Sequence, residues 1–467
     1  MSAASEFLRS AAQKAADLNH RKTLRHAIDQ YDNAVQRGRS RFSDWEAARQ
    51  RSHEIKREAV NHLDKYLLQF EQNVKARGGY VFWAETAGEA RNYVTDLARK
   101  HGVRRVVKAK SMVTEEIHLN PALEKAGVEV FETDLGEFIV QLRNEPPYHI
   151  VTPAMHLSRG DIAKLFREKL GNVDSDDPQL LVAAAREVLR SAFFSADMGV
   201  SGANFLVADS GMIALTTNEG NGRLCTSLPR IHVALAGIEK VIPRFEDLAV
   251  LWPVLSTAGT GQAVTCYNTL VGPRRADEVD GPEEFHIVLL DNGRSQLLAD
   301  PEQREVLHCI RCGACLNACP VFRTVGGHAY GTTYQGPIGS VLTPHLRGQE
   351  FDHLSSASSL CGACTQACPV KIDLHHHLLQ NRRNAVAEGD RSWSERVGFR
   401  LWRWSVLGPG RLAFLGGAGR TVLRILYALG LGGTVLDPLR PWTKIRAVPK
   451  VPSRSFRSLW KESNGAD

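Results

Sequence analysis

Seven of the nine cysteines lie between residues 309 and 368, and their spacing constrains the fold more than any other feature of the chain. The stretch CIRCGACLNACP places Cys309, Cys312, Cys315 and Cys319 in the rhythm C-x2-C-x2-C-x3-C-P. This is the ligand run of bacterial 4Fe-4S ferredoxins, in which one tight loop presents three thiolates to one cluster. The first run therefore predicts an iron–sulfur site.

A second run, SSLCGACTQACPV, repeats this rhythm with Cys361, Cys364 and Cys368, but Ser358 stands where the first run has a cysteine. In two-cluster ferredoxins the last cysteine of each run binds the cluster of the other run. We therefore expect one cluster on Cys309, Cys312, Cys315 and Cys368. The second cluster is expected on Cys319, Cys361 and Cys364, with its fourth corner at Ser358.

The fourth ligand of the second cluster stays open at this stage. Ser358 Oγ or another donor could bind the fourth iron, and His308, His328 and His353 are nearby candidates. Alternatively, the corner is open or filled by a partner protein, or the cluster is a 3Fe-4S form. We expect two iron–sulfur clusters of the 4Fe-4S type, with 3Fe-4S or ligation by a residue other than cysteine as alternatives for the second.

The start of the chain is polar and charged, without the apolar stretch and cleavage site of a secretory signal. We therefore expect a cytoplasmic protein, in which clustered cysteines bind metal rather than form disulfides. Structural zinc is the competing interpretation, but it usually takes two ligand pairs in tetrahedral geometry. The isolated Cys225 and Cys266 are expected to be small buried apolar residues.

Hydrophobic periodicity divides the chain into four regions. Residues 1–75 show helical spacing, and residues 76–300 alternate helical stretches with β-rich runs, which predicts an α/β layer on a mainly parallel sheet. Residues 301–380 hold the cysteines, and the 41 residues between the two runs favour a helical two-cluster module. Residues 381–467 form a basic, aromatic extension. The β-rich runs are YVFWAE, VRRVVKAKS, VEVFETD, YHIVTPA, ANFLVADSG, MIALTT and FHIVLLD.

Two polar loops of the α/β region are candidate ligand sites. The first, residues 218–223, contains Asn218, Glu219, Gly220, Asn221 and Arg223 and follows a predicted strand, where open α/β sheets bind ligands. The second, residues 256–265, could hold an anion through its backbone N–H groups. A further polar set is expected to serve either the core or a carboxylate-binding or docking cleft: Lys108, Lys110, Glu132, Asp134, His149 and His156.

The basic charge of the chain lies in the extension. Between residues 381 and 467, 16 Lys and Arg face six Asp and Glu, a charge of +10, which leaves −3 for the rest of a chain of net charge +7. Arginines and aromatic residues alternate between residues 391 and 436. This composition favours an interfacial helix on the cytoplasmic face of a membrane or docking onto an acidic partner. A packed helical hairpin and, least favoured, nucleic-acid binding are alternatives.

Together these stretches resemble the lactate utilisation protein B family of iron–sulfur proteins. The resemblance spans nearly the whole chain and is carried by RKTLRHAIDQYD, ETDLGEFIVQL, PAMHLSRGDI, TTNEGNGRL, HAYGTTYQGPIGSVLTP and the two cysteine runs. It implies a lactate-utilisation (LUD) α/β domain, similar to sugar-phosphate isomerases and CoA-transferases, followed by a ferredoxin-type module. It also implies that Ser358 belongs to the family pattern.

The resemblance further implies a role in oxidising L-lactate to pyruvate, and so in growth on lactate. Two other lactate-utilisation subunits, one iron–sulfur and one LUD-type, are the implied partners. We expect this chain to be the electron-transfer component, while the catalytic residues, the lactate-binding subunit and the electron acceptor stay open. The alternative is a CoA-transferase or sugar-phosphate-type enzyme with structural clusters, in which Glu219 is an acyl-accepting nucleophile.

Overall fold

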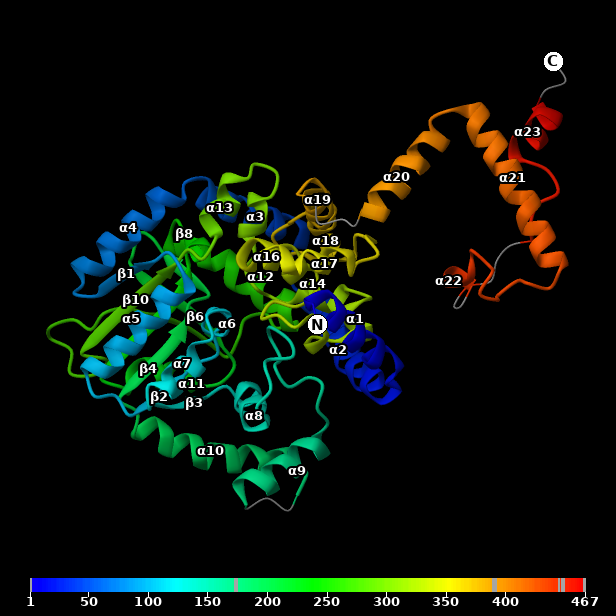
Figure 1. Ribbon diagram of the computed structural model, residues 1–467. Coiled ribbons are helices and arrows are strands. Elements are labelled where there is room, and N and C mark those ends of the chain that lie inside the picture. Colours follow the sequence, from blue (N-terminus) through cyan, green and yellow to red (C-terminus); the bar gives the residue numbers. More distant parts are fainter. Residues whose placement is uncertain (1, 172–174, 389–392, 444–445, 447–449, 465–467) are drawn as a thin grey trace. The chain divides into compact units, whose positions relative to one another are not determined.

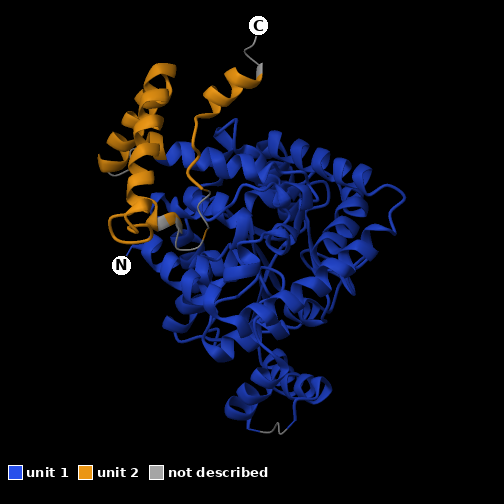
Figure 2. Ribbon diagram, turned by 90° about the vertical axis from the view of Figure 1, so that its right-hand side faces the viewer, with its two compact units in different colours: residues 1–385 blue, residues 386–467 orange. Residues whose placement is uncertain are grey.

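The structure is a computed structural model, and it describes residues 2–171, 175–388, 393–443, 446 and 450–464. The chain divides into two compact units, residues 1–385 and residues 386–467 (Figure 2). The first unit contains the sheets and both cysteine runs. The second unit contains the basic extension.

Four helices open the first unit, as the periodicity of residues 1–75 predicts. They are α1 (Ala3–Ala16), α2 (Leu18–Arg39), α3 (Trp45–Asn61) and α4 (Leu63–Ala76). Ser2, Asp17 and Asp44 begin the first three, because each side-chain oxygen accepts the backbone N–H three residues further on. Leu24 and Ile28 of α2 are fully buried, so the predicted apolar stripe faces the core.

The main sheet has six strands in the order β1-β10-β7-β4-β2-β3, and every neighbouring pair is parallel. All seven residues of the central strand β7 are buried, as expected where helices or sheets cover both faces of a parallel sheet. The predicted α/β class is thereby confirmed. The strands are β1 (Tyr80–Ala84), β10 (Glu284–Leu290), β7 (Ile231–Gly237), β4 (Met198–Gly202), β2 (Arg105–Lys108) and β3 (Glu129–Glu132).

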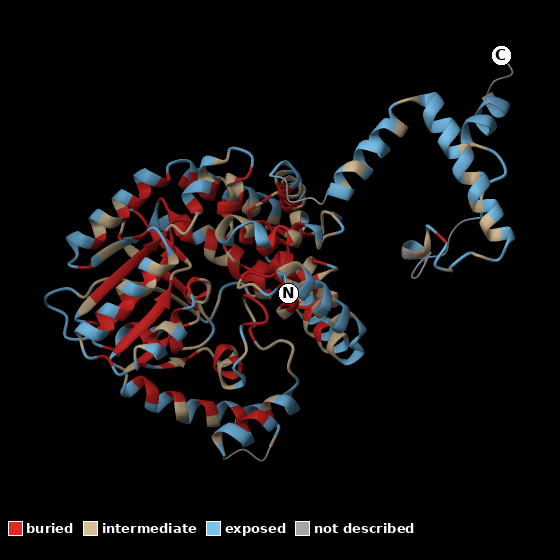
Figure 3. Ribbon diagram, in the orientation of Figure 1, coloured by how far each residue is buried: buried red, intermediate tan, exposed pale blue. Residues whose placement is uncertain are grey.

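The strands of this sheet, labelled in Figure 1, are coloured largely as buried in Figure 3, and their alternate residues pack into different layers. One face packs on α5 (Ala87–Lys100), α6 (Met112–Glu116) and α7 (Leu119–Lys125). The other face packs on α4 and on a second, mixed sheet in the order β8-β5-β6-β9. Its strands are β8 (Val241–Ile242), β5 (Phe205–Val207), β6 (Met212–Thr217) and β9 (Tyr267–Val271). The sequence did not predict this second sheet as a separate layer.

Further helices of the α/β region lie beside the sheets (Figure 1). They are α8 (Leu135–Arg143), α9 (Arg159–Leu170), α10 (Pro178–Phe194), α11 (Asn221–Ser227) and α12 (Leu248–Thr260). α8, α9 and α10 share a small core with one face of β2 and with Cys225 of α11. This cluster supports the edge of the sheet where β2 and β3 lie.

Three local predictions in this region are wrong. The run YHIVTPA forms turns instead of a strand, and the Tyr148 N–H donates to the Pro153 carbonyl rather than to a neighbouring strand. Residues 256–260 form the last turn of α12 instead of a loop, so their N–H groups are engaged within the helix. The short helix α11 begins within the predicted loop of residues 218–223.

The cysteine region is helical, as predicted, and it shares the largest hydrophobic core of the protein with α2, α3 and α12. Its helices are α13 (Arg294–Ala299), α14 (Ala314–Ala318), α15 (Phe322–Val325), α16 (Gly336–Arg347), α17 (His353–Ser356), α18 (Ala363–Ala367) and α19 (Leu374–Ala387). Tyr148 and Ile150 of the turn segment also enter this core. The cysteine runs are therefore held by elements from three parts of the sequence.

The second unit consists of α20 (Trp393–Val406), α21 (Pro409–Ala428), α22 (Arg440–Thr443) and α23 (Phe456–Asn464). No residue of α20 or α21 is buried. Large apolar side chains, among them Phe399, Trp402 and Phe414, are exposed. Within the part of the chain that the structure describes, no helix has the length and apolar character needed to cross a bilayer.

Candidate functional site

The first cysteine loop and the end of the second one close around a single cavity. Cys309, Cys312, Cys315 and Cys368 all line it, together with apolar side chains such as Ile338 and Ile372. Burial raises the pKa of Cys315 well above its usual value, and the negative charges of the other three thiolates raise it further. The four sulfurs that the ferredoxin rule assigns to one cluster thus lie together.

The remaining three cysteines line a separate cavity. Cys319 and Cys364 are buried, Cys361 is exposed, and Ser358 lines the same cavity. Burial and the nearby charge of Cys319 raise the pKa of Cys364 to about 11. Cys315 lies on α14 and Cys319 directly follows it, so one short helix joins the two cavities.

The two loops have the same backbone conformation although one of them lacks its first cysteine. Arg311 directly precedes Cys312, and Leu360 directly precedes Cys361 at the equivalent position of the second run. Both residues are left-handed, with φ of 61° and 55°. The Arg311 N–H donates to Cys309 Sγ at 3.4 Å, and the Leu360 N–H donates to Ser358 Oγ at 3.1 Å. Ser358 Oγ therefore takes the place that a first cysteine sulfur occupies in the other loop.

The loops also supply N–H donors to the sulfurs. The Ile372 N–H lies 3.3 Å from Cys368 Sγ, and the N–H of Ala363 lowers the pKa of Cys361. Donors of this kind stabilise thiolates and tune the potential of a bound cluster. Soft thiolate ligands, backbone donors and an apolar shell fit iron–sulfur clusters. Within the described chain, the second cavity has three thiols and no lining histidine.

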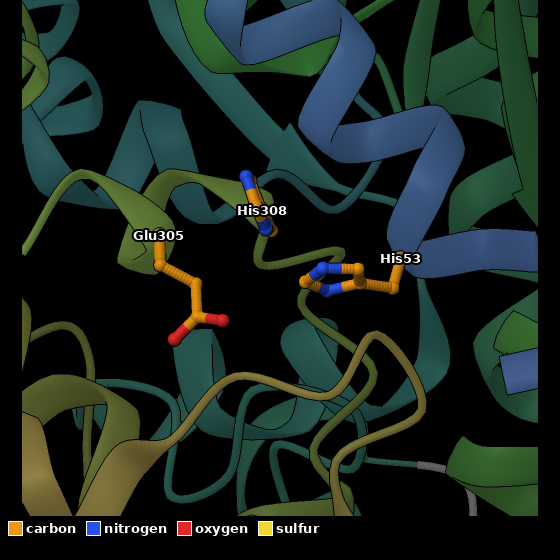
Figure 4. Close-up of side chains that lie close together, drawn as sticks. All are labelled: His53, Glu305 and His308. Carbon is orange, nitrogen blue, oxygen red and sulfur yellow. The ribbon is translucent and has the colours of Figure 1, made fainter. Parts of the chain in front are cut away.

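The three histidines named as alternative donors lie elsewhere. His328 contacts the Pro146 carbonyl, and the Nδ1 of His353 contacts the Glu350 carbonyl. His308, which directly precedes Cys309, forms a cluster with His53 of α3 and Glu305 (Figure 4). Burial lowers the pKa of His308 to about 3, so the ring is neutral at pH 7.

The histidine cluster ties α3 to the cysteine region. His53 Nδ1 lies 3.0 Å from the Val370 carbonyl, and Glu305 Oε2 lies 2.9 Å from His377 Nε2. Glu305 also accepts the Asp373 N–H at 3.1 Å. These contacts fix the segment that carries Cys368 close to the segment that carries Cys309.

A third cavity, polar and of about 230 Å³, adjoins the first cysteine loop. It lies between the α/β region and that loop, and Ile150, Arg311 and Cys312 line both this cavity and the first thiol cavity. We call it the interdomain cavity. Its charged lining residues are Lys110, Asp134, Glu219, Lys240 and Arg311.

A buried charge network supports the cysteine-loop side of this cavity. Arg294 donates to Glu239 at 2.6 Å and to Glu116 at 2.7 and 2.9 Å, and Arg311 reaches Glu239 at 3.2 Å. Burial favours protonation of Glu239, but the charges of Arg294 and Arg311 prevail and lower its pKa to about 2. Arg311 also lies over the ring of Tyr334, 4.6 Å from its centroid.

The predicted loop of residues 218–223 contributes partly to the cavity. Asn218, Glu219 and Asn221 line it, whereas Arg223 is directed to Thr269 at 3.1 Å and lies over Tyr267. Burial and the charge of Asp134 raise the pKa of Glu219 to about 7. At neutral pH this carboxyl group is therefore divided between its protonated and ionised forms.

The other polar predictions separate in the same way. Lys110 and Asp134 line the interdomain cavity. Lys108 is fully buried between Glu115 and Glu132, both at 2.7 Å, and His156 contacts Glu145 at 3.1 Å, so these residues serve the core. His149 accepts the Val151 N–H at 3.1 Å. Cys225 is buried as expected, but Cys266 is exposed, so that prediction is wrong.

The comparisons with known proteins agree with this arrangement. Residues 67–290 match the LUD domain family, and residues 305–372 match the 4Fe-4S dicluster domain family. The chain is 44% identical over 426 residues to proteins named lactate utilization protein B from Bacillus cereus strain AH820 and Bacillus thuringiensis strain Al Hakam. The match covers 90% of this chain and 89% of each relative.

The chain belongs to the lactate utilization protein B family. Membership confirms the resemblance seen in the sequence, and the second domain match identifies the cysteine region as an iron–sulfur domain. The solved structure of a DUF162 family protein from Deinococcus radiodurans is similar at a TM-score of only 0.26 and 12% identity, over 49% of this chain and 98% of that one.

In this family member, sequence reasoning missed two cations of the interdomain cavity. Lys240 lies in the apolar run GIEKVIP, and Arg311 lies inside the first cysteine run. A charged residue within an apolar run that leads out of a buried strand is a usable signal, because such a side chain needs a partner or a ligand. That Arg311, about 70 residues later in the chain, lies near Lys240 could not be predicted from the sequence.

Proposed function

We propose that this chain is the iron–sulfur electron-transfer subunit of a complex that oxidises L-lactate to pyruvate. The family name supports the link to lactate, and the iron–sulfur domain supports electron transfer. The observation that carries the proposal is the crossing of the two runs, because Cys368 lies with the first loop and Cys319 lies with the second. Two such sites joined by α14 form a short path for electrons.

In this proposal Cys309, Cys312, Cys315 and Cys368 hold the first 4Fe-4S cluster, and Cys319, Cys361 and Cys364 hold the second. When bound, each cluster accepts and releases one electron at a time. The protein contributes the N–H donors to the sulfurs, the apolar shell that excludes water, and the nearby Arg311. A positive charge near the first cluster favours its reduced form.

At the fourth corner of the second cluster we propose Ser358. Its Oγ lines the cavity and has the backbone setting of Cys309 in the equivalent loop. A 3Fe-4S cluster bound by the three thiols alone is the alternative. The two differ by one iron, which an elemental count resolves.

The partners in this proposal are one further iron–sulfur subunit and one LUD-type subunit. The cytoplasm is the proposed compartment, because seven clustered thiols need a reducing environment. The second unit could add contact with anionic lipid through residues 391–436. Its support is the exposure of Trp402, Trp404 and Phe414 on helices that carry no acidic residue after Glu395.

Flotation of the full-length protein with anionic liposomes tests the membrane contact. Recovery in the floating fraction should fall when Trp402 and Trp404 are both replaced by Ser, and it should fall with neutral liposomes. A matched control replaces Phe194 and Leu180, which are exposed in the first unit. Equal recovery of all variants would contradict the proposed contact with anionic lipid.

The CoA-transferase alternative receives less support. An acyl-accepting glutamate must be ionised, but burial and Asp134 raise the pKa of Glu219 to about 7. Glu219 also accepts the Leu135 N–H at 3.3 Å, which holds the carboxylate against α8. Full lactate oxidation by a Glu219→Gln variant, assayed with both partners, would dispose of a nucleophilic role.

Anaerobic purification followed by iron and sulfide analysis tests the main proposal. About eight iron and eight sulfide per chain are expected for two 4Fe-4S clusters, and about seven iron if the second is a 3Fe-4S form. Lactate should bleach the visible absorbance only when both partner subunits are present. A chain that binds zinc and shows no visible chromophore would overturn the proposal.

A further inference from the structure

The interdomain cavity has the features of a binding site for a small anion. It holds about 230 Å³, and its walls come from the end of β6, the start of α11, the last turn of α12 and the first cysteine loop. Arg311 and Cys312 separate it from the thiol cavity of the first cluster, because both residues line both spaces. A molecule bound here would lie beside the first cluster site.

One charged residue of this cavity makes no direct polar contact within the described chain. Lys110 donates to the Val151 carbonyl at 2.5 Å, Asp134 caps α8, Glu219 accepts the Leu135 N–H, and Arg311 pairs with Glu239. Among the residues that the structure describes, Lys240 has neither a hydrogen bond nor an ion pair, although it is only 5% exposed. The anionic groups that act on Lys240 are the Cys309 thiolate and Glu239, and Glu239 already binds Arg294 and Arg311. A buried ammonium group with no anion in direct contact is costly.

Three further polar atoms on the lining residues are unpaired. Arg311 Nη1, Thr216 Oγ1 and Asn221 Oδ1 are buried and have no hydrogen-bond partner in the described part of the chain. Buried polar atoms of native proteins almost always have partners, so four unpaired groups around one cavity can receive a polar ligand or ordered water. Two of the four are cationic. The Thr216 hydroxyl can donate to a hydroxyl or keto oxygen, whereas Asn221 Oδ1 can only accept from a hydroxyl.

We propose that the interdomain cavity binds a short 2-hydroxy or 2-oxo carboxylate. Lys240 and Arg311 pair with the carboxylate, and the Thr216 hydroxyl donates to the oxygen on the neighbouring carbon. Asn221 Oδ1 accepts a hydrogen bond from that oxygen where it is the hydroxyl of a 2-hydroxy acid. The choice of this ligand class rests on the proposed function, whereas the anion site rests on the cavity and its unpaired groups. The proposal gives this subunit the substrate or product site and places it against the first cluster.

A competing role for Lys240 is to balance the charge of the first cluster. The two roles differ in what a ligand does, because a cation that serves only the cluster needs no small anion. Binding is therefore measured on the purified full-length protein that carries its clusters, without partner subunits, by anaerobic calorimetric titration. Pyruvate is the main probe because, unlike lactate, it cannot be oxidised by the clusters during the titration. Acetate and phosphate are the comparison anions.

We expect saturable binding of pyruvate, with the affinities for acetate and phosphate at least about tenfold lower. Lys240→Met should weaken pyruvate binding by at least about tenfold, the loss expected for one charge-assisted hydrogen bond. Lys240→Arg should retain most of the affinity. Lys100→Met, which removes an exposed lysine of the α/β region, is the matched control and should bind like the wild type.

Electron paramagnetic resonance of the dithionite-reduced protein gives a second measurement. Pyruvate should change the signal of one cluster in the wild type and not in Lys240→Met. No pyruvate binding to an iron-replete protein overturns this inference and leaves electron transfer standing. Equal binding of phosphate overturns the ligand class. Protein without iron and sulfide overturns the proposed function instead, whatever the cavity binds.

Discussion

Replacement of Arg294 by Met should destabilise the first unit strongly. The guanidinium is 1% exposed and donates four hydrogen bonds, three to Glu116 and Glu239 and one to the Asp291 carbonyl. Met fills similar space but leaves the buried Glu116 without a counter-charge and Glu239 with Arg311 as its ion-pair partner. Breaking a buried pair in this way costs about 3–5 kcal/mol of unfolding free energy.

Anaerobic urea titration measures this loss, with circular dichroism and tryptophan fluorescence as independent probes. Arg230→Met is the matched control, because Arg230 is half exposed and reaches Glu283 only at 3.4 Å. Its loss should stay below about 1 kcal/mol. A double variant that adds Glu116→Gln should recover much of the stability, since Glu239 keeps Arg311 as its partner and Glu116 no longer carries a charge.

The stability lost in Arg294→Met should depend on pH, through the ionisation of the buried carboxylates. Burial alone would raise the pKa of Glu239, but Arg294 and Arg311 lower it to about 2, so in the wild type its contribution is present above pH 4.5 and is lost only as pH falls through about 2. In Arg294→Met the carboxylates lose this support and can take up protons. The loss of stability should therefore be largest at pH 7 and smaller at pH 5. Equal losses in Arg294→Met and Arg230→Met at pH 7 would refute the reasoning.

Three other predictions concern the sites. Ser358→Cys should keep the second cluster at four iron and shift its paramagnetic signal, whereas an unchanged signal would place Ser358 away from the iron. Gly313→Ala and Gly362→Ala both place a side chain at a φ near 78°, a strain of about 1 kcal/mol, but only the first also approaches His149 Cε1 at 2.9 Å. Gly313→Ala should therefore lose more iron on mild heating, and equal loss would contradict this. Pyruvate binding should strengthen as pH falls through about 7, because Glu219 then loses its negative charge beside Asp134 and Lys110. In a titration series from pH 6 to pH 8, Glu219→Gln should remove that dependence.

The sequence predicted the parallel sheet and the cysteine loops because both depend on short-range patterns. Alternating strand and helix signals specify the layers, and the spacing of the cysteines specifies which sulfurs a loop can present. The crossing of Cys319 and Cys368 followed from a rule for two-cluster ferredoxins rather than from the fold.

The local errors have physical causes. Pro146 and Pro147 precede the run at residues 148–154 and Pro153 lies within it, so that its apolar residues enter the core without a strand ladder. Residues 256–260 look like a loop because they contain Gly, Ser and Thr. In the structure the Ser256 and Thr260 hydroxyls donate to carbonyls four residues earlier, which satisfies them inside a helix.

The interdomain cavity was beyond sequence reasoning for a different reason. Its two key cations are about 70 residues apart, and neither belongs to a motif for anion binding. Only the packing of β7, β8 and the cysteine loop brings Lys240 and Arg311 to one space. The polar loop at Asn218 and Glu219 was predicted because it directly follows a strand, and that order can be read from the local sequence.

The crossing of the two cysteine runs is the central claim, and two matched variants test it most directly. Cys368→Ala and Cys319→Ala each remove the last cysteine of one run, and the paramagnetic spectra of both reduced proteins are compared with the wild type. Cys368→Ala should alter the signal of the cluster held by Cys309, Cys312 and Cys315, and Cys319→Ala should alter the other signal. Loss confined in each case to the cluster of the same run would contradict it.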